Sequence, residues 1–149
     1  MLLLLNRLGD PRQDLVALSL ANAVALQGWH VSVVATARGD TEVELMYKAI
    51  SPDFVVLDAV APPTAFPAIV SAAINLRQPR VVIVADGLAG AILPLLKRAH
   101  SGHVAFLNLL EAQGSAARGV TVPAALAPDA AFRQALYAEL GGKDVLHHV

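Results

Sequence analysis

The fold is decided by the first 35 residues, which read MLLLLNRLGDPRQDLVALSLANAVALQGWHVSVVA. Two short apolar runs, residues 2–5 and 31–35, enclose a segment of helical length and composition at residues 11–27. Continuous apolar runs, unlike alternating ones, are typical of strands that are buried on both faces of a parallel sheet. This stretch therefore predicts a β-α-β unit.

The same alternation continues along the chain. Further strands are predicted at residues 54–57, 81–85 and 104–107, and further helices at residues 41–50, 65–76, 88–99 and 109–117. Alternating strands and helices form right-handed units around a parallel sheet. We expect one flavodoxin-like, Rossmann-like α/β domain with a doubly wound, five-stranded parallel sheet in three layers. Residues 1–113 form its core, and residues 114–149 add an irregular segment and a C-terminal helix near residues 129–140.

Several polar residues have a predicted structural role at helix ends. Asp10 is the expected N-cap of the first helix, because Pro11 follows it at the first helical position. Residues 41–44, TEVE, have the pattern of a capping box with Thr41 as the cap. Gly28 stands where the first helix should end.

Composition excludes several classes of function. The chain is 56% hydrophobic and 15% charged, below the roughly 25% charged residues of typical domains. It contains no cysteine, which excludes disulfides, thiolate metal sites and cysteine nucleophiles. A net charge of −1 gives no electrostatic reason to expect nucleic acid or anionic lipid. The leading apolar run is too short for a signal peptide or a membrane span, so we expect a soluble, cytoplasmic protein.

Ligands of open α/β sheets bind outside the carboxyl ends of the strands. The ligand-binding candidates at this edge are Asp10, Arg12, Asp58, Asp86, Gly87 and Asn108. Neither a Gly-x-x-x-x-Gly-Lys loop nor a Gly-x-Gly-x-x-Gly after the first strand is present, so we do not expect standard nucleotide binding. His100 and His103 straddle a helix end and a strand start, so no metal site is expected from them.

One segment resembles a receiver domain. Residues 52–58, PDFVVLD, are similar to the third strand of a receiver, which ends in its phosphoacceptor, here Asp58. Phosphoryl transfer needs a metal held by acidic residues after strand 1, where this chain has Asn6 and Arg7. Ala85 stands where a hydroxyl residue is expected, and no lysine follows the fifth strand. A pseudo-receiver that docks to a protein without phosphate is therefore one interpretation.

A larger part of the chain resembles the cobalamin (vitamin B12)-binding domain. That family carries Asp-x-His-x-x-Gly after strand 1, Ser-x-Leu at the end of strand 3 and Gly-Gly at the end of strand 4. Residues 10–15 (DPRQDL), 58–60 (DAV) and 86–87 (DG) take these places, at separations similar to those of the family. Residues 28–31 (GWHV) are similar to its entry into strand 2, and the resemblance covers residues 1–113.

The departures from this family determine the functional expectation. Arg12 replaces the axial His, and a guanidinium has no lone pair to give to cobalt. Leu15 replaces the Gly beside the corrin tail, while Asp58 and Asp86 replace Ser and Gly. The resemblance thus implies a non-catalytic sensory, regulatory or protein-interaction domain without His-ligated cobalamin. A base-on corrinoid, a tetrapyrrole or a cationic small molecule is a possible ligand. A further interpretation is a small subunit of a cobalamin-type enzyme.

The first predicted helix also indicates self-association. Its apolar residues surround the helix almost completely, and a helix that is apolar all round is normally buried. Either the C-terminal helix or a partner chain would cover it. Because most such partners are copies of the same chain, we expect a homodimer or a complex with a partner protein.

Overall fold

The computed structural model describes residues 1–100, 102 and 104–109. The strands in this part of the chain are β1 (Leu2–Leu5), β2 (Ser32–Ala35), β3 (Phe54–Val56), β4 (Val81–Val84) and β5 (Ala105–Asn108). The α-helices are α1 (Pro11–Leu26), α2 (Thr41–Ile50), α3 (Phe66–Arg77) and α4 (Leu88–Ala99). Two short 3-10 turns, η1 (Leu57–Ala59) and η2 (Pro63–Ala65), lead from β3 into α3. The predicted alternation is confirmed, whereas the helices expected at residues 109–117 and 129–140 lie outside the described residues or extend beyond them.

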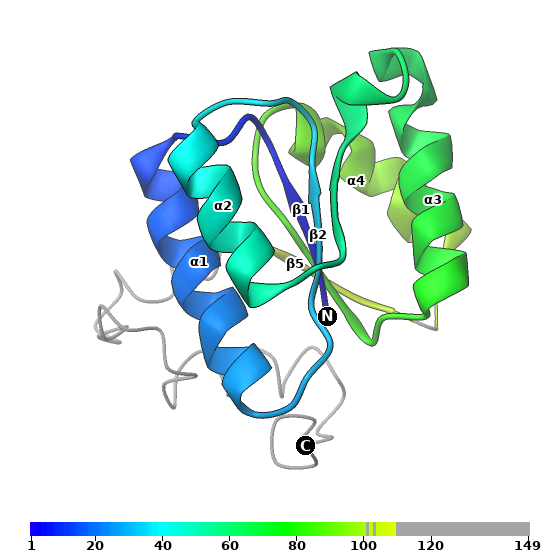
Figure 1. Ribbon diagram of the computed structural model, residues 1–149. Coiled ribbons are helices and arrows are strands. Elements are labelled where there is room, and N and C mark those ends of the chain that lie inside the picture. Colours follow the sequence, from blue (N-terminus) through cyan, green and yellow to red (C-terminus); the bar gives the residue numbers. More distant parts are fainter. Residues whose placement is uncertain (101, 103, 110–149) are drawn as a thin grey trace, which may run out of the picture.

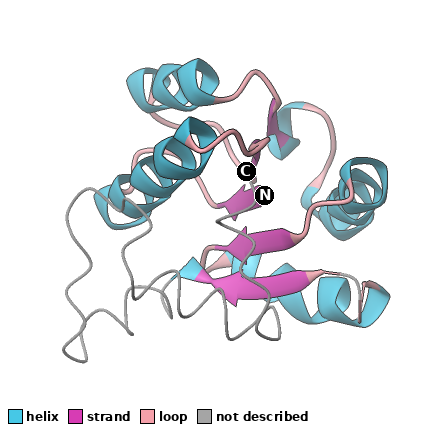
Figure 2. Cartoon of the chain, turned by 90° about the horizontal axis from the view of Figure 1, so that it is seen from below, coloured by secondary structure: helices cyan, strands magenta, loops and turns pink. Residues whose placement is uncertain are grey.

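The five strands form one parallel sheet in the order β3-β2-β1-β4-β5. Helices α1 and α2 lie on one side of it, and α3 and α4 lie on the other (Figure 1). Figure 2, which is turned by 90° about the horizontal axis, also shows the strands between two layers of helices. The expected flavodoxin-like class, a doubly wound sheet of five parallel strands in three layers, is confirmed.

The strand order fixes which loops are neighbours. The chain runs outward from β1 through β2 to β3, and it then returns to the opposite side of β1 as β4. This is the order of dinucleotide-binding domains, whose switch point lies beside the first strand, between β1 and β4; flavodoxin itself places its switch point between β1 and β3. Residues that follow β1 and β4 are therefore neighbours. Residues that follow β3 lie at one edge, separated from β1 by β2.

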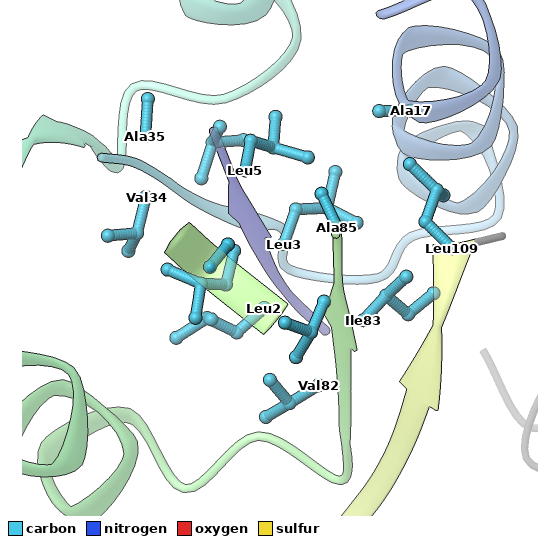
Figure 3. Packing of buried hydrophobic residues seen from close by; sticks show 14 of the residues in the cluster. Leu2, Leu3, Leu5, Ala17, Val34, Ala35, Val82, Ile83, Ala85 and Leu109 are labelled. Atoms are coloured by element: carbon cyan, nitrogen blue, oxygen red, sulfur yellow. The ribbon is translucent and has the colours of Figure 1, made fainter. Parts of the chain in front are cut away.

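The apolar runs form the core because the central strands are covered on both faces. All four side chains of β1 are fully buried, and those of β4 are no more than 1% exposed. These strands belong to a single core cluster that also contains Ala17 of α1 and Leu109, just beyond β5 (Figure 3). Full burial of one aliphatic side chain stabilises a fold by about 1.5–3 kcal/mol. Continuous rather than alternating apolar sequence is what this arrangement requires.

The helix caps follow the sequence with one correction. Asp10 is the N-cap of α1, and its carboxylate accepts a hydrogen bond from the Arg12 backbone N–H at 3.0 Å. The predicted Thr41 cap is wrong, because Asp40 caps α2 by accepting from the N–H groups of Glu42 and Val43. The Asp40 N–H is itself bonded to the Leu8 carbonyl at 3.1 Å. This contact holds Asp40 in an extended conformation and starts the helix at the next residue.

Candidate ligand-binding site

At the switch point, a side chain from the end of β1 is hydrogen-bonded to the start of α4. The Asn6 amide, at the end of β1, donates to the Asp86 carbonyl and accepts from the Ala89 N–H at 2.9 Å. Asn6 thereby caps α4, whose own cap position is Gly87. A Cβ at Gly87 would stand 3.3 Å from the Asn6 amide atoms, and the φ of Gly87 is +71°. The first helical turn of α4 thus already has a polar partner.

The other predicted site residues divide into separate groups. Asn108, at the end of β5, donates to the Asp86 carboxylate at 3.1 Å, so Asp86, Gly87 and Asn108 do lie together. Asp58 lies apart from them beyond β2, where its carboxylate accepts from the Arg38 N–H at 3.3 Å. Asp10 and Arg12 lie at the start of α1. The structure therefore does not bring the six candidates to a single point.

A depression lies instead between the loop after β1 and the loop after β2. Its volume is about 410 Å³, and it is open to solvent. The depression is lined by Arg7, Leu8, Gly9, Asp10, Gly39 and Asp40. The N-caps of α1 and α2 thus face one opening at the carboxyl end of the sheet, one strand away from the switch point between β1 and β4.

The two loops approach each other so closely that a glycine is required. A Cβ at Gly39 would stand 1.8 Å from the Leu8 carbonyl oxygen, far inside any permitted contact. Gly9 has a φ of +109°, a conformation that side chains disfavour, and its Cβ would lie 3.2 Å from that of Asp40. These two glycines set the shape of the depression.

A buried polar network holds the loop after β1 in place. Gln13 and Asp14, in the first turn of α1, are 7% and 4% exposed. The Asn6 N–H donates to the Gln13 side chain at 2.8 Å, and the Gly9 N–H donates to the Asp14 carboxyl group at 2.6 Å. The Gln13 amide donates to Asp14 at 3.1 Å, so the two side chains brace each other. Loop backbone that would otherwise need water is satisfied from within.

Tyr47 links this network to the second helix. Its hydroxyl donates to Asp14 at 2.9 Å, and the tyrosine has no exposed surface. Burial raises the pKa of Tyr47 well above its ordinary value, and the charge of Asp14 and the hydrogen bond to it raise the pKa further. The phenol consequently remains a hydrogen-bond donor at any ordinary pH. Through Tyr47, α2 helps to hold the loop between β1 and α1.

Sequence reasoning missed the members of this network. Neither Gln13 nor Asp14 was assigned a site role from the sequence, and both are buried. The spacing contained a usable signal, because Ala17, Ala21 and Val24 are buried and lie at i+3, i+7 and i+10 from Asp14. Nothing in the sequence identified Tyr47 as the partner, since that contact joins residues 33 positions apart.

The charges around the depression favour a cationic group. Asp10 and Asp40 use their Oδ1 atoms to cap helices. A carboxylate offers about four lone-pair sites in total, so each can still accept hydrogen bonds from a ligand. Arg7 is the one basic residue on the same lining. The lining therefore offers two acidic residues to a cationic group and one basic residue to an anionic group.

The residues do not fit the axial coordination of cobalamin. Arg12, at the place of the axial His, is an exposed residue in the first turn of α1, and its guanidinium cannot ligate a metal. Leu15, at the place of the Gly, is a 66% exposed side chain on the same helix. Two of the four departures seen in the sequence, Arg12 and Leu15, therefore lie on the surface of α1.

The chain matches no family model, no curated protein and no solved structure. Its function must therefore be inferred from its own residues. Within the described residues, none of the helices is long and apolar enough to cross a bilayer. The same residues contain no group of three or more His, Asp or Glu side chains that could hold a metal ion.

Proposed function

We propose that this protein is a non-catalytic sensory or regulatory domain that binds a small cationic molecule in the depression between the β1 and β2 loops. The main support is that contacts within the protein hold both loops in place. Gln13, Asp14 and Tyr47 hold one loop, and the Gly39 approach to Leu8 holds the other. A site that is already formed does not lose binding free energy to loop ordering.

A binding role also agrees with what the acidic side chains do. Asp10, Asp40 and Asp58 accept hydrogen bonds from backbone N–H groups. Asp86 accepts from the Asn108 amide. Carboxylates that accept such hydrogen bonds hold the backbone in position, and their negative charge attracts cations. Both properties suit a binding site. The role is of the regulatory kind that the cobalamin-domain resemblance implies, with a different ligand.

The proposed ligand class is a small amine, with an amino-acid-like molecule as the fullest match. Its ammonium group would donate to Asp10 and Asp40, and a carboxylate on the same molecule would accept from Arg7. Hydrogen bonds to charged groups contribute about 1.5–3 kcal/mol each. Recognition of both groups would separate amino-acid-like ligands from simple amines.

Calorimetric titration with three matched probes tests the proposal. Alaninamide carries the ammonium group alone, alanine carries both charges, and N-acetylalanine carries the carboxylate alone. Alanine and alaninamide are expected to bind, and N-acetylalanine is not. Binding of N-acetylalanine alone, or of none of the three, would contradict a cation site.

Charge-removing variants that keep the helix caps locate the site. Asn is about as good an N-cap as Asp, so Asp10→Asn and Asp40→Asn should change the free energy of unfolding by less than about 0.5 kcal/mol. Each should weaken alaninamide binding by about tenfold, which is about 1.4 kcal/mol. Glu42→Gln is the matched control, because Glu42 is exposed in the first turn of α2 but does not line the depression. An equal loss in Glu42→Gln would indicate a general charge effect.

A further inference from the structure

We draw no further inference here: the strongest candidate, the hydrogen-bonded pair of half-buried Ser71 on α3 and buried His100 at the end of α4, joins two helices of one layer, and nothing in the described part of the chain shows a ligand or partner for it.

Discussion

The two ends of the sheet use carboxyl groups in different ways. At the amino end, the Asp53 carboxylate accepts hydrogen bonds from Arg77 Nε and Nη2, each at 2.6 Å, and from the Ser32 hydroxyl at 2.5 Å. At the carboxyl end, Asp14 accepts a hydrogen bond from the Gly9 N–H of the loop after β1, and Asp40 accepts from two N–H groups in the first turn of α2. The amino-end cluster joins side chains of α3, β2 and the start of β3, whereas the carboxyl-end groups shape backbone.

This difference explains why a ligand site is expected at one end only. A bidentate arginine occupies both oxygens of Asp53 and neutralises its charge, so that cluster is complete in itself. A carboxyl group that accepts one or two backbone hydrogen bonds fixes a loop and keeps capacity for a ligand. The cluster at the amino end therefore stabilises the fold, and the carboxyl groups at the other end hold the loops that could bind a ligand.

The largest loss of stability is expected when Asp14, the buried carboxyl group at the carboxyl end of the sheet, is replaced. Asp14→Ala removes the acceptor of Gly9, Gln13 and Tyr47. Each buried donor left unsatisfied costs about 1–3 kcal/mol, so the free energy of unfolding should fall by about 3 kcal/mol or more. Urea denaturation measures this loss. A loss below about 1 kcal/mol, the ordinary effect of a single point mutation, would mean that the network does not hold the loop.

The amino end should respond to acid. The hydrogen bond from Arg77, with those from Ser32 and His30, lowers the pKa of Asp53 well below its ordinary value, despite its partial burial. A lowered folded-state pKa stabilises the protein above the unfolded-state pKa of about 3.9, and this stability is lost as the pH falls through the folded value. The contribution at neutral pH should be about 2 kcal/mol, as for hydrogen bonds to charged groups.

Denaturant unfolding of the Asp53→Asn variant between neutral pH and strong acid tests the amino-end cluster. The variant should lose stability at neutral pH and show a flatter dependence below about pH 4 than the unaltered chain. Parallel curves for the two proteins would show that the Asp53 cluster does not contribute to the acid response.

Much of the architecture could be predicted, because local rules determine it. The apolar run of β1 and the Asp10–Pro11 start of α1 identify their elements without any tertiary contact. The strand order could not be read in this way, since each β-α-β unit is compatible with either side of the sheet. The order separates Asp58 from Asp86, although both follow strands and looked equivalent in sequence.

The candidate site was predictable only in part. Asp10 was identified from its place before Pro11, but Asp40, Gly39 and the buried Asp14 gained their importance from contacts between two loops. Such contacts depend on the distance between the two loop backbones, and residue types alone do not indicate that distance. Arg12 remains a ligand candidate that the lining of the depression does not include.

A smaller effect is expected when only the link between the helices is lost. Tyr47→Phe keeps the buried ring and removes one hydrogen bond to Asp14, which retains its bonds from Gly9 and Gln13. The free energy of unfolding should fall by about 1 kcal/mol. Hydrogen exchange at the Gly9 amide should become faster, and an unchanged rate would show that α2 does not support the loop.

No effect is expected for phosphorylation of Asp58. Its carboxylate accepts the Arg38 N–H, and β2 separates it from the Asn6 and Arg7 end of β1. Incubation with Mg²⁺ and a small phosphodonor should leave the intact mass unchanged. A gain of one phosphoryl group that Asp58→Asn abolishes would instead favour a working receiver at this edge.

Amide chemical shifts during titration with alaninamide would show whether a cation binds at the carboxyl end of the sheet. Gly9 and Gly39 line the depression, whereas Gly28 follows α1 at the opposite end of the sheet. We expect saturable shifts of the Gly9 and Gly39 amides, an unmoved Gly28 amide, and an alaninamide concentration at half-saturation that is about tenfold higher in Asp40→Asn. Shifts of Gly28 as large as those of Gly9, or no shift at either loop glycine, would contradict it.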